Sequence, residues 1–204
     1  MKPREIALCG MFLALAGVVH FLLRFTVVLT GGIQMAVSIA IYCLIALLIP
    51  MSLAEASLVG IVNGIVLMVA TASPFPLANI PSHFSGLVSA KLLTNALKGN
   101  EQKLSPLKVS LIVGIATTVS FLLFIIPAYY GILHLSSFAN TAIPVTRGIL
   151  AGSITFLAYA SASFTVIYIP TLIANLIISP ILYEALRPGL VRYGFIAESG
   201  MKPL

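Results

Sequence analysis

Long apolar stretches alternate with short polar or basic segments along this chain of 204 residues. No charged residue interrupts positions 6–23, 56–90, 109–146 or 148–183. Stretches of this length meet the requirement of roughly 20 residues for a helix that crosses a bilayer core of about 30 Å. Hydrophobic residues make up 60% of the chain and charged residues only 8%. Because a soluble domain of this size cannot hide so much apolar surface, the pattern predicts an all-α integral membrane protein.

Glycine, proline and polar clusters divide the apolar sequence into six predicted membrane-spanning helices within a single domain, 1–204. The expected spans are 5–23, 33–49, 53–71, 82–98, 106–126 and 168–187. Thr30-Gly31-Gly32 separates the first two spans, Ser73-Pro74-Phe75-Pro76 ends the third, and Pro188-Gly189 follows the last. Glycine and proline at these places are typical of helix ends and turns. The range 146–163 is a further apolar segment, although its glycines and serines make it less apolar than the others.

The distribution of basic residues decides between six and seven spans. With six spans, one side of the membrane receives Lys2, Arg4, Lys98, Lys103, Lys108, Arg187, Arg192 and Lys202. The other side receives Arg24 and Arg147. Basic residues accumulate in cytoplasmic loops, so both termini are expected in the cytoplasm and 146–163 is expected to form an outer-side or partly re-entrant helix before the last span. The same rule explains the net charge of +6 without a nucleic-acid partner. A multi-pass protein of the plasma membrane is expected.

A stripe of small residues runs along the first predicted helix. Ala7, Gly10, Ala14 and Gly17 are spaced three, four and three residues apart, which places them on one helix face. Small residues let a second helix approach closely. The partner helix could belong to the same bundle, or the stripe could be a docking face for a separate membrane subunit.

The link between the third and fourth spans is stiffened by three prolines and carries the polar residues Asn79, Ser82 and His83. A rigid loop of this kind suits a lid or wall of a binding pocket. Phe75 lies in the same link.

Several polar residues interrupt apolar spans, where such groups usually face the interior of a helical bundle and bond to one another or to a ligand. His20, Gln34 and Asn175 are candidate ligand contacts, whereas Asn63 is expected to form an interhelical hydrogen bond. Arg24 follows His20 by one helical turn. It could hold a substrate carboxylate bidentately or extend to lipid phosphate.

Signatures of catalysis are not apparent in the sequence. The three histidines have no carboxylates at the spacing of metal ligands, and no glycine-rich phosphate loop is present, so no cofactor, metal or ATPase activity of its own is expected. The chain is expected not to be an enzyme. Two other classes remain open: an intramembrane Ser/His hydrolase using Ser153 and His83, and a membrane assembly protein without a ligand.

In order and spacing, several segments of the chain resemble the substrate-binding S components of energy-coupling factor (ECF) transporters, most closely the tryptophan transport protein branch. The resemblance is carried by positions 7–20, Gly31-Gly32, Gly60-Ile-Val-Asn-Gly64, Phe75-Pro76, Ile80-Pro81, Val88-Ser89-Ala90, Ile169-Pro170-Thr171, Asn175 and Pro180. It implies a six-helix protein that captures one small nutrient from outside the cell and works with a transmembrane coupling protein and two ABC-type ATPases. It also implies that Ala7, Gly10 and Ala14 contact the coupling protein.

The chain departs from the tryptophan branch at two places near the expected pocket. It has Gln34-Met35-Ala36 and Ser85-Gly86-Leu87 where members of that branch carry charged residues. An aromatic amino acid is the first expected substrate, with Arg24 or an amide of the 71–83 loop at its carboxylate and Phe75, Tyr159 or Tyr168 beside its ring. Another vitamin or precursor is the alternative.

Overall fold

A computed structural model describes residues 1–27, 34–99, 101 and 103–196, and in these residues the chain is helical and has no strand. The helices are α1 (Pro3–Leu22), α3 (Ser38–Leu48), α4 (Leu53–Ala70), α5 (Asn79–Lys98), α6 (Pro106–His134), α7 (Pro144–Leu150), α8 (Phe156–Ser163) and α9 (Ile169–Arg192). Single turns η1 (Leu23–Phe25), η2 (Pro76–Ala78) and η3 (Ser136–Phe138) extend or connect them, and the π-helical segment η4 (Phe164–Tyr168) joins α8 to α9. The predicted break at Gly31-Gly32 and the basic residue Lys202 lie outside the described residues.

Four helical segments of the described chain are long and apolar enough to cross a membrane: Pro3–Phe25, Leu53–Ala70, Pro106–His134 and Phe156–Arg192. Large apolar side chains such as Val69, Leu107 and Leu157 are exposed on them. An exposed apolar surface of this extent is stable only against an apolar surrounding. These features indicate a helical membrane protein.

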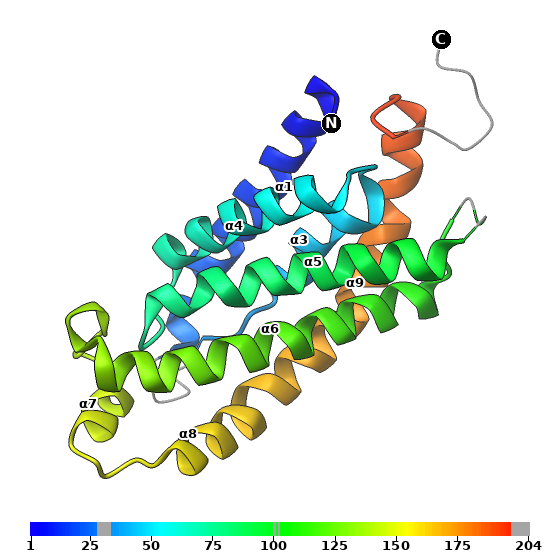
Figure 1. The fold of residues 1–204 in the computed structure, drawn as a ribbon. Helices are drawn as coiled ribbons and strands as arrows, with labels where there is room; N and C mark the ends of the chain where they lie inside the picture. The colour runs from blue at the N-terminus through cyan, green and yellow to red at the C-terminus, as the bar shows by residue number, and fades with distance from the viewer. Residues whose placement is uncertain (28–33, 100, 102, 197–204) are drawn as a thin grey trace.

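Two of the six predicted spans differ in character from these four. The second, expected at 33–49, contains α3, which has only 11 residues and at 1.5 Å per residue is too short to cross a bilayer core. The fourth, expected at 82–98, is α5, which starts at Asn79 and has 20 residues but is not apolar enough to count as a span by composition. Its buried polar residues include Ser82, His83 and Thr94. Since α5 lies between α4 and α6 (Figure 1), these groups face protein rather than lipid.

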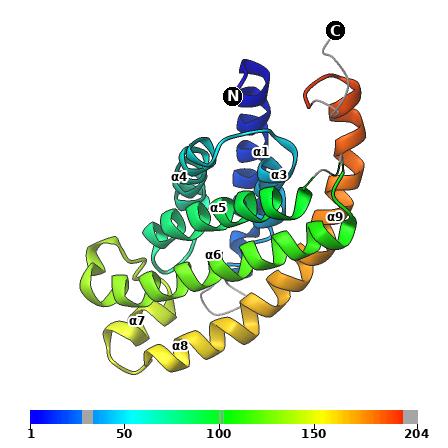
Figure 2. The same ribbon diagram turned by 45° about the vertical axis from the view of Figure 1, so that its right-hand side comes forward.

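The last part of the chain also departs from the predicted boundaries. The expected helix at 106–126 continues to His134 in α6. The expected outer helix at 146–163 is two pieces, because α7 ends at Leu150 and Gly152 follows with a φ of +71°, a left-handed conformation that favours glycine. The Thr155 side chain then caps α8, which runs through η4 into α9 as one continuous helical segment (Figure 2).

α3 forms the centre of the bundle. Every one of its residues is buried, and it packs against α1, α5, α6 and α9. Beside it, α4 and α5 approach closely because a Cβ atom at Gly64 would lie only 2.7 Å from the Ile80 Cα atom, and one at Gly60 only 3.1 Å from the Phe84 Cα atom. Asn63 lies between these glycines, buried, and no hydrogen-bond partner for its amide is found in the described residues, contrary to the interhelical bond expected for it.

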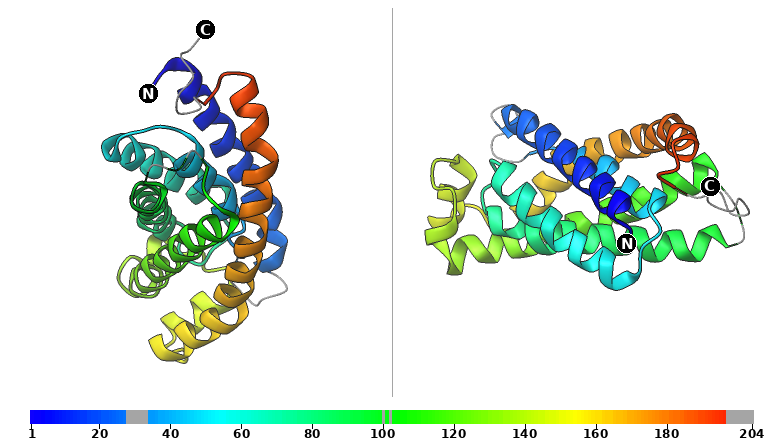
Figure 3. Two further views of the ribbon diagram at one scale, coloured as in Figure 1. Left: turned by 90° about the vertical axis from the view of Figure 1, so that its right-hand side faces the viewer. Right: turned by 90° about the horizontal axis from the view of Figure 1, so that it is seen from above.

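The start of α1 and the end of α9 lie at the same end of the bundle in both views of Figure 3. At the other end, α1 and α4 finish while α3 and α5 begin. Of the predicted site residues, His20 lies near the end of α1, Gln34 lies before α3, and Asn79 and His83 lie at the start of α5, so the fold brings them toward one region.

Candidate functional site

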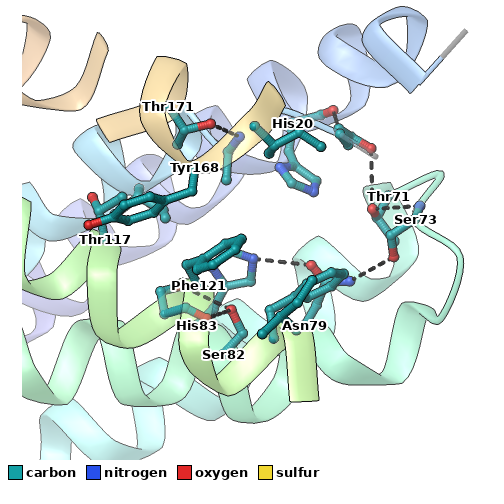
Figure 4. A pocket seen from close by; sticks show the side chains of 17 residues that line it. His20, Thr71, Ser73, Asn79, Ser82, His83, Thr117, Phe121, Tyr168 and Thr171 are labelled. Carbon is teal, nitrogen blue, oxygen red and sulfur yellow. Dashed lines mark hydrogen bonds between the residues drawn. The ribbon is translucent and has the colours of Figure 1, made fainter. Parts of the chain in front are cut away.

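A cavity lies where the ends of α1, α3, α4 and α5 meet the middle of α6 and the start of α9 (Figure 4). It contains about 560 Å³ of empty space, a figure that includes the part open to the surroundings. Its polar wall is lined by His20, Gln34, Thr71, Ser73, Asn79, Ser82 and His83. The facing wall is lined by Thr117, Ser120, Phe121, Phe124, Ile125, Ile167, Tyr168 and Thr171.

His83 is held in one orientation by both ring nitrogens. Its Nε2 atom lies 3.2 Å from Asn79 Oδ1, and its Nδ1 atom lies 3.3 Å from the Tyr42 hydroxyl. An amide oxygen only accepts, so Nε2–H donates to Asn79, and Nδ1 therefore accepts from Tyr42. Asn79 Nδ2 in turn donates to the Pro76 carbonyl oxygen at 2.8 Å and to Ser73 Oγ at 3.4 Å. This network fixes the start of α5 against the link that precedes it.

His20 is held through only one of its two ring nitrogens. Its Nδ1 atom lies 3.1 Å from Ser38 Oγ at the start of α3. The residue is only 2% exposed, so its Nε2 atom is shielded from water, and this atom has no hydrogen-bond partner in the described residues. Figure 4 shows the His20 ring pointing into the cavity. A buried nitrogen without a partner is costly, so this atom is available for a ligand.

Gln34 ties three segments together at the rim of the cavity. Its Nε2 atom donates to the carbonyl oxygen of His20 at the end of α1. Its Oε1 atom accepts from Thr71 Oγ1 at 3.2 Å and from the Ala72 backbone N–H at 2.9 Å, after the end of α4. Both polar ends of the Gln34 side chain are therefore used within the protein.

The facing wall is aromatic and aliphatic. The Phe121 and Tyr168 rings lie with centroids 4.9 Å apart, and the Tyr168 hydroxyl lies 2.8 Å from Thr118 Oγ1. The π-helical segment η4 ends at Tyr168, so it places this ring next to Phe121 on α6. Ser82 Oγ donates to the Ser120 carbonyl oxygen at 2.8 Å and closes the wall between α5 and α6.

Five of the eight predicted ligand-contact residues line the cavity: His20, Gln34, Asn79, His83 and Tyr168. Asn175 lies next to the lining, where its Nδ2 atom donates to Thr117 Oγ1 at 3.2 Å and to the Ala36 carbonyl oxygen at 3.3 Å. Phe75 is buried against α6, where its ring occupies the space beside Gly131. Tyr159 is also buried, in the same apolar cluster as Phe75.

Arg24 lies away from the cavity. Its side chain is exposed, and its guanidinium carbon lies 5.1 Å from the centroid of the Phe21 ring on the same helical segment. Among the lining residues in the described part of the chain there is no lysine, arginine, aspartate or glutamate. The group expected to hold a substrate carboxylate is therefore not at the site that the other predicted residues form.

Sequence reasoning missed Thr117, Ser120, Phe121 and Thr171 as lining residues. Hydroxyl groups in membrane helices often bond to their own backbone, as Thr118 does to the Gly114 carbonyl oxygen, so a serine or threonine alone carries little signal. The available signal was the clustering of Thr117, Thr118 and Ser120 within one turn of an apolar helix.

No group of three or more histidine, cysteine, aspartate or glutamate side chains able to hold a metal ion occurs in the ranges that the structure describes. Ser153, the candidate nucleophile of the hydrolase alternative, lies in the turn after α7, where its hydroxyl donates to the Gly148 carbonyl oxygen at 3.0 Å. It does not line the described cavity with His83. Comparison with protein families, with curated proteins and with solved structures finds no match to this chain.

Proposed function

We propose that this chain is the substrate-binding S component of an ECF-type importer and captures a small nutrient at the plasma membrane. The observation that carries the proposal is the cavity itself, in which polar groups from α1, α5 and the links before α3 and after α4 face a wall from α6 and η4 that contains aromatic rings. A cavity with a few fixed polar groups and apolar surfaces is typical of small-molecule sites. The resemblance of the sequence to S components supports the same reading.

The proposal includes six membrane segments with both termini in the cytoplasm. In this arrangement α5 and the segment that contains the short helix α3 cross within the bundle, where α1, α4, α6 and α9 shield them from lipid. The start of α1 and the end of α9 lie at the same end of the bundle. This position supports an even number of membrane crossings, because an even number returns the chain to the side where it began. The cavity then opens toward the outer side, where α1 and α4 finish.

The proposed docking face for the transmembrane coupling protein consists of Ala7, Gly10 and Ala14. All three are exposed, and a Cβ atom added at Gly10 would have no neighbour within 4 Å. Gly17 differs, because a Cβ atom there would lie 2.9 Å from Val66 Cγ1 of α4. The stripe therefore divides into one residue that packs inside the bundle and three that leave room for a partner helix. Two ABC-type ATPases would supply the energy for uptake.

The cargo implied by the resemblance is tryptophan or a related aromatic compound, with another vitamin or precursor as the alternative. The test is a thermal-unfolding screen of the purified protein in detergent or nanodiscs against amino acids and vitamins. A ligand that binds only the folded state raises its stability by about 2.7 kcal/mol at a hundredfold excess over Kd. A shift with one compound supports capture. Association with partner subunits but no shift with any compound favours a ligand-free assembly protein instead.

A further inference from the structure

In the part of the chain that the structure describes, the cavity lining offers no charge that could pair with an ionised ligand. Its lining residues in the described part of the chain carry hydroxyl, amide, imidazole and hydrocarbon groups. An unpaired imidazolium would itself be a buried charge, so both histidines are neutral here. A carboxylate or ammonium group moved from water into this space would lose its hydration and find no partner of opposite charge.

The helix ends around the cavity do not replace the missing charges. Two helices, α1 and α4, present their partially negative ends, while α3 and α5 present partially positive ends, so the dipoles offset one another. Backbone N–H groups in the first turn of α3 are already used: the Ile39 N–H donates to the Ala36 carbonyl oxygen at 3.1 Å and the Ala40 N–H to the Val37 carbonyl oxygen at 3.1 Å. At the start of α5, the Asn79 N–H donates to the Pro76 carbonyl oxygen.

His20 Nε2 is the one buried and unpartnered side-chain nitrogen or oxygen among the lining residues that the structure describes. The Ser38 hydroxyl can donate to Nδ1 or accept from it, so either neutral tautomer of His20 is compatible with that contact. The free nitrogen can therefore donate to a ligand carbonyl group or accept from a ligand N–H. The Phe121 and Tyr168 rings pack on one another with a tilt of 36° and provide an apolar aromatic surface on the facing wall.

From these observations we infer that the captured molecule is an uncharged, planar compound with an amide-like or ring N–H/C=O edge, which hydrogen-bonds to His20 Nε2 while its flat face packs on Phe121 and Tyr168. This inference rests on the proposed capture function and narrows its substrate class. It excludes zwitterionic amino acids, tryptophan included, and favours an uncharged vitamin-like compound or precursor.

The first experiment separates the ligand class from the capture function. The small-molecule pool of a yeast extract is divided by cation exchange at acid pH and then by anion exchange at neutral pH, so that amino acids and carboxylic acids are retained and compounds uncharged at neutral pH pass through the second column. The protein in nanodiscs is then unfolded thermally with each fraction. Stabilisation by the neutral fraction supports the inference. Stabilisation by a retained fraction alone overturns the substrate class but leaves capture standing, and stabilisation by none overturns capture and this inference with it.

A matched set of probes tests the same point with defined compounds. Indole-3-acetamide and indole-3-acetate have nearly the same shape and differ in charge, and tryptophan adds the zwitterion. We expect the amide to bind at least about tenfold more tightly than either charged compound, because only the charged compounds bury an unpaired ion. Equal or tighter binding of the acetate or of tryptophan overturns the inference.

Two variants of His20 test the contact itself, with the neutral fraction or the amide as the probe. The His20→Asn side chain retains a polar nitrogen or oxygen near Nδ1 but leaves the Nε2 position empty, whereas the His20→Gln side chain reaches the Nε2 position. We expect about a tenfold loss of affinity in His20→Asn and a smaller loss in His20→Gln. Unfolding without ligand checks that both variants fold. Unchanged affinity in a folded His20→Asn protein overturns the contact.

Discussion

The His20 and His83 rings meet edge to face with centroids 5.9 Å apart, although one belongs to α1 and the other to α5. His83 is also edge-on to Tyr42 of α3, with centroids 5.4 Å apart. Both nitrogens of His83 are bonded within the protein, while His20 keeps one nitrogen that has no partner in the described ranges. The pair therefore combines a fixed ring that maintains the wall with a ring that can respond to a ligand.

Replacing His83 or Asn79 by alanine is expected to weaken ligand binding by about 1–3 kcal/mol, because each change breaks the hydrogen-bond network that fixes the start of α5 as a wall of the cavity. Isothermal titration with the compound found in the screen measures the effect. His134→Ala at the exposed end of α6 is the matched control and should leave affinity unchanged. Wild-type affinity in both cavity variants would remove the start of α5 from the site.

The Tyr168 ring and its hydroxyl are expected to contribute differently. Tyr168→Phe keeps the ring against Phe121 and loses only the contact to Thr118, so affinity should change by less than about threefold. Tyr168→Ala removes the aromatic surface and should weaken binding by about 2 kcal/mol or more. The two dissociation constants are compared directly. A large loss in Tyr168→Phe would show that the ligand needs the hydroxyl.

Gly131→Ala is expected to destabilise the fold by about 1–3 kcal/mol, because the added Cβ atom would lie 2.4 Å from Cε1 of the Phe75 ring. Chemical unfolding in detergent measures the change. Gly10→Ala is the matched control, since a Cβ atom there has open space on α1. Adding Phe75→Leu should recover part of the loss in Gly131→Ala, and failure to do so would show that the clash is not with the Phe75 ring.

Bulky residues on the exposed stripe of α1 are expected to separate binding from uptake. Gly10→Leu combined with Ala14→Leu should abolish uptake by the assembled transporter, because the partner helix can no longer approach, while ligand affinity stays at the wild-type value. Leu15→Phe adds bulk on the other flank of the same helix, where Leu15 is 49% exposed, and should leave both unchanged. Parallel loss of binding and uptake in the double variant would count against a docking face.

The sequence was sufficient to predict helices where apolar stretches are bounded by glycine, proline or capping residues. The predicted spans 5–23 and 53–71 agree closely with α1 and α4, the second of which starts at a Ser52–Glu55 capping box. It could not show that α3 is surrounded by protein, because a helix in lipid and a helix in a protein core are both apolar on every face. Nor could it show that the polar face of α5 is covered by α4 and α6, which depends on packing between helices.

The candidate site was predictable to the extent that its polar groups stand out from apolar surroundings. Histidine and amide residues such as His20, Gln34 and Asn79 did so, and the fold brings them to one cavity. Arg24 stood out equally, but it lies only four residues from His20, and a turn of η1 is enough to direct it away from the cavity. The contribution of Phe121 is invisible in the sequence because an aromatic residue in an apolar helix fits lipid, core and pocket alike.

The complete burial of α3 has a consequence for how the chain is made. Its partners include α9, which is separated from it in sequence by more than 100 residues and is therefore synthesised well after it. When residues 38–48 leave the ribosome, much of the surface that will cover them does not yet exist. Until α9 arrives, this short segment must be sheltered by lipid, by the insertion machinery or by α1. The burial of α3 is thus complete only when α9 packs against it, so truncation before α9 should leave the protein open to quality-control proteolysis.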